Sequence, residues 1–521
     1  MAPQQQNPQG PLNMSPPRPE ISILISGAGI GGLMTALELH RYGFQHIRIL
    51  ERNPHNSHLG DSFTIGPTAV QAFRNWPWMQ QRSAEIGYEP LAAMHTCTGE
   101  RLKGPMEFGE LMGGKGGKGG ELGGKQTDLV PKVYRHTRPK FHGMLLEQLE
   151  SVGIAVEYGK AVASYFEDAN GGKGGVVLQD GEKITADLVV AADGINTNSQ
   201  ELITGHPVPA RPSGSAIWRV AFPVEIAMED PAVAERFRLM EDGRSVIELW
   251  FGPGMHGVFW RSEDQMSWAI THPDEGTAAE SWLHRSSPEE VLKFTAKIPG
   301  WPEVADRVIK LTPPDQLVHW QLKWRDPQPK STSPAGRVVQ LGDAAHTFLP
   351  TSGSGGTQAM EDAVSLATCL SLAKDPAKIP EAICVHELLR FQRVSCLQAF
   401  GVKNAKDFRS AGEKPSTAKS IPGTTETATQ AQGPPAPAST ETPKPAAKGP
   451  PLVHVAKWML EHDPEQYAID NYGKALSHLT HDTEFENTNK PMNMQYRPWT
   501  IDGLLEAQRK GEPTVLDGDW S

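Results

Sequence analysis

The strongest constraint on the fold lies near the N-terminus, where a six-residue β-type run, 21–26, leads directly into a glycine-rich turn. The turn reads Gly27-Ala-Gly29-Ile-Gly-Gly32, and apolar residues at helical spacing follow it. A strand, a G-x-G-x-x-G turn and a helix in this order are typical of a dinucleotide-binding βαβ unit. Gly27 permits the tight turn, Gly29 lets the backbone approach a pyrophosphate, and Gly32 lets the helix pack closely on the strand.

A carboxylate completes this first unit. The predicted second strand, 46–50, ends in Glu51. That residue lies about 20 positions after the glycines, where an acid commonly accepts hydrogen bonds from ribose hydroxyl groups. The sequence therefore predicts dinucleotide binding, and the alternative is a Gly-rich turn in an unrelated α/β unit.

A second glycine-rich segment, far downstream, predicts another ligand-binding turn. It contains, in order, a short buried strand at 337–341, then Gly342, Asp343, Pro350, Gly353, Gly355 and Gly356. A helix that begins at glycines presents unobstructed N–H groups, and these attract an anion or a developing negative charge. The alternative is a Gly-rich connector that only leads into a core helix at 360–372.

A third candidate is Asp193-Gly194, which ends the apolar run 188–192. Parallel α/β sheets bind ligands at the carboxyl ends of their strands, and this turn is predicted to lie there. On its own, an Asp-Gly pair is a common turn.

Pattern and composition divide the chain into an α/β domain interrupted by a β-rich insertion. Four runs in the insertion alternate in the manner of strands: 216–222, 246–251, 257–260 and 266–271. Such runs favour a mostly antiparallel sheet. We predict a Rossmann-type domain in two parts, 20–204 and 331–408, an inserted sheet domain at 205–330 and a helical region at 452–521. Three stretches are expected not to pack: a polar tail at 1–19, a flexible Gly/Lys loop at 113–125 and a low-complexity linker at 409–451.

Aromatic residues gather in the insertion. Eight of the 13 tryptophans lie in or beside it: Trp218, Trp250, Trp260, Trp268, Trp282, Trp301, Trp320 and Trp324. They predict either a ligand cavity lined by aromatic rings or a tryptophan-rich sheet packed on helices, and the sequence does not decide between the two.

Charge and composition exclude several classes of partner. The net charge of −11 argues against nucleic acid or an anionic membrane as the main partner, because both need a basic field. No run of about 18 apolar residues occurs, so no integral membrane segment is expected. The four cysteines show no C-x-x-C spacing, and no metal site is expected. Reduced thiols and the absence of an apolar leader run predict a cytoplasmic protein.

Taken together, the three motifs resemble those of the FAD-dependent aromatic-ring monooxygenases. Further segments are similar to salicylate-hydroxylase-like enzymes of fungal secondary metabolism: Gly60-Asp-Ser-Phe-Thr-Ile-Gly-Pro67, Gly342-Asp-Ala-Ala-His346 and His462-Asp-Pro-Glu-Gln-Tyr467. The resemblance covers residues 22–472 apart from the low-complexity pieces. It implies that FAD is the cofactor, that NADPH or NADH reduces it, and that the inserted sheet is a substrate domain.

The resemblance also implies individual contacts with FAD. The glycines of the first turn and Glu51 would hold the adenosine end of FAD, and Arg138 would reach its phosphate region. The alternative for Arg138 is a surface arginine at a helix start. Asp343 would accept hydrogen bonds from the ribityl chain or the pyrophosphate, and Asp193 would touch the pyrophosphate.

Other residues are implied to lie at the flavin ring. The amides of Gly355 and Gly356 would face the pyrimidine edge, where a helix N-terminus stabilises an anionic reduced flavin. Pro350 would lie beside the position at which oxygen adds. The implied reaction is hydroxylation or epoxidation of an aromatic, indolic or polyketide molecule by a flavin hydroperoxide formed with O2. The alternatives are a flavin reductase or dehydrogenase that transfers no oxygen, and a protein that binds FAD without catalysis.

Two residues are candidates for contact with the substrate. Arg219 lies among apolar residues and needs an anion, a carbonyl group or the flavin nearby, unless it simply leaves the sheet. Asp61 corresponds to a loop beside the flavin and could either orient a substrate or cap a turn. We expect His346 to have a structural role in the second glycine-rich segment.

Two departures from the family pattern bear on the substrates. Gln200 stands where relatives often carry arginine, which leaves open the choice between NADH and NADPH. The strand 255–261 lacks a tyrosine that would hold a phenolate. A neutral aromatic or indolic substrate is therefore favoured over a small phenolic acid.

Overall fold

The structure is a computed structural model. It describes residues 8–56, 60–107, 110, 121–122, 125–126, 134–168, 170, 172–281, 284–410, 457–518 and 520. The predicted Gly/Lys loop and the predicted linker lie almost entirely outside these residues, as does Trp282.

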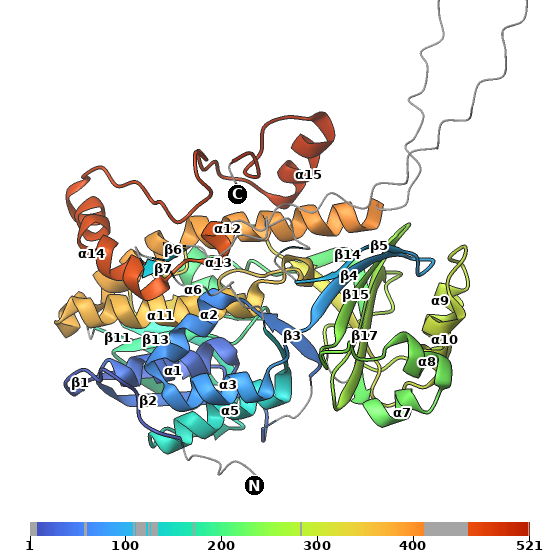
Figure 1. The fold of residues 1–521 in the computed structure, drawn as a ribbon. Coiled ribbons are helices and arrows are strands. Elements are labelled where there is room, and N and C mark those ends of the chain that lie inside the picture. The colour runs from blue at the N-terminus through green and yellow to red at the C-terminus, as the bar shows by residue number, and fades with distance from the viewer. Residues whose placement is uncertain are drawn as a thin grey trace, which may run out of the picture.

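A five-stranded parallel sheet forms the centre of the α/β part (Figure 1). Its strands, in spatial order, are β19 (Val338–Gln340), β13 (Leu188–Ala191), β1 (Arg18–Ser26), β2 (Phe44–Glu51) and β9 (Val156–Tyr158). Ser26 at the end of β1 is in register with Ala191 and Leu50, so three strands end at one edge. This arrangement confirms the predicted α/β class. It also brings Glu51 and the Asp193 turn to the same edge as the first glycine turn.

The predicted tail is shorter than expected. Strand β1 begins at Arg18, which lies within the tail boundary of residue 19. Before it, the Leu12 amide donates to the carbonyl of Asn75, and the Ser15 amide donates to that of Arg41. These backbone hydrogen bonds hold the segment against the folded domain, although its polar composition predicts that it does not pack.

The two faces of the parallel sheet are covered differently. Ile23 and Ile25 belong to a core with several helices, whereas Leu24 packs with a small antiparallel sheet, as the two-residue period of a strand requires. Four of these helices are α1 (Ile30–Arg41), α5 (Arg138–Ser151), α11 (Gly355–Ala373) and α12 (Ile379–Ser410). The small sheet consists of β10 (Val162–Asp168), β11 (Lys173–Leu178) and β12 (Lys183–Ala186).

The β-rich insertion forms most of a second, seven-stranded sheet. Its order is β18 (Val318–Trp324), β14 (Arg211–Pro223), β17 (Gln265–Pro273), β16 (Met255–Arg261), β15 (Val246–Gly252), β4 (Leu91–Thr96) and β5 (Arg101–Met106). All neighbours are antiparallel except β15 and β4. The last two strands come from the first part of the chain, so the predicted boundary at residue 205 misses them. Strand β4 shows no alternation that could reveal it, because its first five residues are all buried.

The structure shows whether the described tryptophans line a ligand cavity or pack in the core of the inserted sheet. Trp218, Trp250 and Trp268 belong to a core formed with α9 (Pro288–Thr295) and α10 (Glu303–Lys310). No described tryptophan lines the cavity considered below. These three tryptophans therefore pack a sheet on helices, as one of the two alternatives predicted, and the cavity takes its aromatic side chains from phenylalanines instead.

Shorter elements and the C-terminal region complete the described chain. The remaining elements are β3 (Ser62–Ile65), α2 (Pro67–Val70), η1 (Gln71–Asn75), α3 (Pro77–Ile86), β6 (Glu121–Leu122), β7 (Lys125–Gln126), β8 (Tyr134–Thr137), α6 (Gln200–Thr204), α7 (Val224–Met228), α8 (Pro231–Arg236), η2 (Gly342–Ala344), η3 (Pro350–Ser352), η4 (Pro376–Lys378), α13 (Lys457–Leu460), α14 (Pro464–His481) and α15 (Ile501–Lys510). The C-terminal region runs along α12 (Figure 1). Within the described ranges, no helix is both long and apolar enough to cross a bilayer.

Candidate active site

The first glycine turn has the geometry of a ligand cradle. Gly27 has a φ of 105°, and a Cβ on it would lie 2.3 Å from the carbonyl oxygen of Ala192. A Cβ on Gly32 would lie 2.0 Å from the carbonyl oxygen of Gly27. Gly29 differs, because its φ is −75° and a Cβ there would meet nothing within 4 Å. Clashes with the protein's own backbone therefore require glycine at Gly27 and Gly32, whereas the space over Gly29 is open.

Glu51 is fixed beside this turn. One carboxylate oxygen, Oε2, accepts a hydrogen bond from the Ala28 amide at 3.1 Å. The other, Oε1, accepts from the Asn53 amide at 2.9 Å. The carboxylate remains partly exposed and has lone pairs free for a further donor.

The second glycine-rich segment brings Asp343 close to Arg138. Each charge shifts the pKa of the other, although desolvation is the largest influence on both. Desolvation lowers the pKa of Arg138 and raises that of Asp343. Both side chains are nevertheless exposed to solvent, as expected for groups that project into a space surrounded by protein. Two residues predicted from segments about 200 positions apart therefore share one environment.

Helix α11 begins without a side-chain cap. Its N-cap, Ser354, makes no capping hydrogen bond, and the first turn contains no acidic residue. Gly353 precedes it with a φ of 61°. A Cβ on Gly355 would lie 4.0 Å from the Asp343 carboxylate, whereas a Cβ on Gly356 would contact Ile65 at 3.5 Å. The helix start thus offers N–H groups to a ligand beside Asp343.

Asp193 is more enclosed than predicted. Its Oδ2 accepts a hydrogen bond from the Tyr165 hydroxyl at 2.6 Å. Its Oδ1 is buried and has no hydrogen-bond partner among the described residues. Burial raises the pKa of the Asp193 carboxyl group. Contact between Asp193 and a cofactor remains a prediction, and its link to Tyr165 in β10 had no sequence signal.

Arg219 and Asp61, predicted as separate substrate contacts, bind each other. The Arg219 Nε donates to Asp61 Oδ2 at 2.6 Å, and Arg219 Nη2 donates to Asp61 Oδ1. Their side chains are 21% and 11% exposed. The carbonyl oxygen of Asp61 also accepts from the Arg138 amide at 2.9 Å. The anion that Arg219 needs is therefore supplied by the protein.

A cavity of about 250 Å³ lies where the seven-stranded sheet meets the start of α11. Pro350, Gly353 and Ser354 line it on the side of the second glycine-rich segment. Strands β15 and β16 and helix α12 contribute the apolar side chains Ile247, Leu249, Phe251, Val258, Leu397, Phe400 and Phe408 to its lining. Among the described residues, Arg135 and His256 are the only ionisable groups that line it. Arg219 and Asp61 do not line it.

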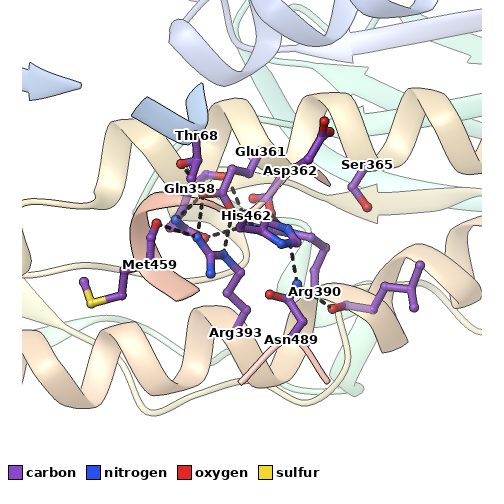
Figure 2. Close-up of polar contacts among 12 residues, drawn as sticks. Thr68, Gln358, Glu361, Asp362, Ser365, Arg390, Arg393, Met459, His462 and Asn489 are labelled. Atoms are coloured by element: carbon purple, nitrogen blue, oxygen red, sulfur yellow. Dashed lines mark hydrogen bonds and ion pairs between the residues drawn. The ribbon is translucent and has the colours of Figure 1, made fainter. Parts of the chain in front are cut away.

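The C-terminal region contributes a wall of this cavity through α13, by way of Met459 and Leu460. Arg393 of α12 holds α13, because its guanidinium donates to the carbonyl oxygens of Trp458 at 2.9 Å and Met459 at 3.1 Å. Figure 2 shows the same guanidinium directed at Glu361 of α11, whose Oε2 accepts from it at 2.7 Å. No chemical role is predicted for this region from the sequence.

Next to this contact, a buried network fixes α11. Asp362 accepts from the Arg390 guanidinium at 2.7 Å and bonds to His346 Nε2 at 2.5 Å. It also accepts from the amide of Gly342, which begins the second glycine-rich segment. Although burial raises the pKa of Asp362, the charges of His346 and Arg390 outweigh it and hold the pKa well below its usual range. His346 thus orients the segment, in keeping with its expected structural character.

Comparison with known proteins identifies the family. A family model described as an FAD binding domain matches residues 20–375. The chain belongs to this FAD-binding family. It is 40% identical over 515 residues to the FAD-dependent monooxygenase dmxR9 of Cryptosporiopsis sp., covering 97% of this chain and 91% of that relative. The enzyme is thus an FAD-dependent monooxygenase, as the resemblance implied.

Solved structures show the same fold. The crystal structure of FqzB matches with a TM-score of 0.72 and 26% identity, over 93% of this monooxygenase and all of that chain. A salicylate hydroxylase substrate complex matches with a TM-score of 0.57 and 20% identity, over 78% and 91% of the two chains. These matches show that both solved proteins share the fold of this chain.

The residues present fit FAD. The open space over Gly29 admits a pyrophosphate, and Glu51 retains lone pairs for ribose hydroxyl groups. Arg138 supplies a cation near Asp343, and the uncapped start of α11 lies beside the cavity. The chemistry of this donor set matches an anionic dinucleotide.

Proposed function

We propose that this monooxygenase uses NADPH or NADH and O2 to hydroxylate or epoxidise an aromatic, indolic or polyketide small molecule. The cavity carries the proposal, because its walls are mostly apolar and one of them is the helix start expected to face the flavin. The resemblance of the sequence motifs to enzymes of fungal secondary metabolism favours a role in natural-product biosynthesis. All four cysteines are free thiols, which supports a cytoplasmic location.

FAD, when bound, supplies the redox chemistry that takes electrons from the nicotinamide and activates O2. The chain's own part is to place the substrate and exclude water. Phe400, Phe408 and Leu397 of α12 form an apolar wall, and Met459 closes the cavity from the C-terminal side. A dry cavity strengthens every electrostatic contact inside it and protects reactive species from hydrolysis.

We assign a positioning role to the Arg219–Asp61 pair. Neither side chain lines the cavity, and each neutralises the other. Through the carbonyl oxygen of Asp61, the pair also holds the first residue of α5, Arg138. The pair thereby ties β14 of the large sheet to the predicted phosphate contact of FAD, and it sets the relation between substrate and cofactor.

The test is product formation by the FAD-loaded enzyme with NADPH and candidate metabolites, followed by mass spectrometry. We expect a product heavier than its substrate by one oxygen atom, and no such product without O2. FAD reduction by NADPH without any oxygenated product, across phenolic, indolic and polyketide candidates, would instead favour the reductase alternative. A yellow protein inert to both NADH and NADPH would favour a non-catalytic FAD-binding protein.

A further inference from the structure

Arg135 lines the cavity and forms no ion pair with any residue that the structure describes. It lies on β8, in register with Thr64 of β3, and its guanidinium carbon lies 4.8 Å from the ring centroid of Trp260. Its Nε is buried and has no hydrogen-bond partner among the described residues. Arg135 as a whole is half-buried, and a guanidinium held partly out of water is costly unless an anion meets it.

No carboxylate of the described chain meets that need. The described lining of the cavity contains neither aspartate nor glutamate. Asp61 is close enough to influence Arg135, but Arg219 already occupies both of its carboxylate oxygens. Burial lowers the pKa of Arg135 to about 10, so the side chain remains charged at neutral pH.

The second ionisable group of the cavity, His256, is neutral. Burial, and then the charge of Arg409, lowers its pKa to about 4. Its Nδ1 is buried and unpartnered among the described residues, and its ring meets that of Phe408 edge-on at 5.2 Å. A neutral imidazole offers one donor and one acceptor. His256 therefore cannot supply the missing negative charge, but it can bind a hydroxyl or carbonyl group.

Strand β16 sets the distance between His256 and the Trp260 ring on which Arg135 lies. His256 and Trp260, which carries Arg135 on its ring, are four residues apart and so point to the same face of the strand. At about 3.3 Å per residue, their Cα atoms are roughly 13 Å apart. Val258 lies between them and lines the cavity. Two or three fused rings with polar groups at both ends suit this spacing.

We propose that Arg135 and His256 are the specificity-determining residues for an aromatic substrate that carries one negatively charged oxygen. The anionic oxygen lies against Arg135, and a hydroxyl or carbonyl group at the far end of the ring system bonds to His256. The inference rests on the proposed function and narrows its substrate class. It departs from the expectation of a neutral substrate, which considered only the missing tyrosine.

The experiment measures binding of matched aromatic probes to the full-length, FAD-loaded protein by the change in flavin absorbance. One pair is 2-naphthoate and 2-naphthamide, and the other is 2,4-dinitrophenolate and its neutral methyl ether. We expect the wild-type enzyme to prefer the anion of at least one pair by about tenfold or more. The pair that discriminates identifies the oxygen as carboxylate or phenolate.

Substitutions of Arg135 and His256 test which residue causes the preference for the anionic probe. Arg135→Met should abolish it, Arg135→Lys should retain part of it, and the exposed control Arg238→Met should leave it unchanged. For His256, 6-hydroxy-2-naphthoate should bind more tightly than 2-naphthoate, and His256→Phe should remove that gain while keeping the anion preference. Equal or tighter binding of both neutral probes by the wild type would overturn the proposal, as would an unchanged preference in Arg135→Met.

These outcomes are separable from failure of the proposed function. Probe binding needs no turnover, so it can support the inference even if no oxygenated product forms. If the enzyme oxygenates neutral substrates and shows no preference for anions, the result would support the proposed function and contradict the role of Arg135. If Arg135→Met does not fold, the wild-type probe pairs and Arg135→Lys still decide the question.

Discussion

Arg219 and Asp61, 158 residues apart in the chain, form a two-point ion pair between the large sheet and the loop that precedes β3. The pair is mostly buried, and its backbone end also holds the first residue of α5. One contact therefore connects the sheet behind the cavity to the cofactor-binding helix.

Removing either partner of this pair should weaken the fold and the cofactor site together. We expect Arg219→Ala and Asp61→Asn each to lower the free energy of unfolding by about 2 kcal/mol, because a mostly buried charge is left unpaired. The double variant should cost no more than either single variant. Denaturant unfolding of the four proteins measures this coupling, and additive losses would show that the two side chains act independently.

Substitutions at two glycines of the first turn should have different effects on the stability of the apoprotein and on the affinity for FAD. Gly29→Ala is compatible with the local backbone and meets no protein atom, so the apoprotein should melt as the wild type does. Its affinity for FAD should fall about tenfold or more, or about 1.4 kcal/mol, because the methyl group occupies the ligand's space. Gly32→Ala is the matched control and should destabilise the apoprotein itself, since its Cβ clashes with the Gly27 carbonyl group. Tight FAD binding by Gly29→Ala would place the pyrophosphate elsewhere.

Helix α14 should loosen in acid. Burial would raise the pKa of Glu465, but Arg41 and the hydrogen bonds from Tyr42 and Arg74 outweigh it and hold the pKa at about 2. Because the pKa in the folded state lies below the usual value of 4.5 for glutamate, this contact stabilises the fold above about pH 4.5 and is lost as the pH falls toward 2. Glu465→Gln should therefore melt below the wild type at neutral pH. The difference in Tm should narrow below about pH 4.5, and a constant difference would contradict the assignment.

The C-terminal wall of the cavity should affect the substrate and leave FAD bound. Met459→Ala enlarges the cavity and removes apolar contacts, so we expect KM for the substrate to rise by about tenfold. FAD affinity should stay within error of the wild type. Met492→Ala, at an exposed methionine of the same region, is the control and should change neither quantity. If KM is unaffected by Met459→Ala, α13 does not border the substrate.

Local sequence patterns predicted the parts of the fold that depend on neighbouring residues. The β1–turn–α1–β2 unit follows from glycine conformations and from alternating or helical spacing, so its position was predictable. Joining β4 to the large sheet depends on parallel pairing with β15, more than 150 residues later, and no local pattern encodes that register.

The candidate site shows the same division. Arg138 and Asp343 were predicted because family motifs mark them, and the structure brings them into one environment. The partner of Arg219 was missed because an ion pair between distant segments leaves no periodic trace. Met459 was missed because it follows a low-complexity stretch, and Arg135 because a strand arginine has no special spacing.

The most direct test of the account is the coupling of NADPH oxidation to product in a variant that fills the cavity. Val258→Phe places a bulky ring on the cavity face of β16, away from the predicted FAD contacts. Product and NADPH consumption are measured together for the wild type and the variant, each loaded with FAD. We expect the variant still to oxidise NADPH and to form hydrogen peroxide, with the amount of product per NADPH reduced at least tenfold. An unchanged ratio would mean that oxygen transfer takes place outside this cavity.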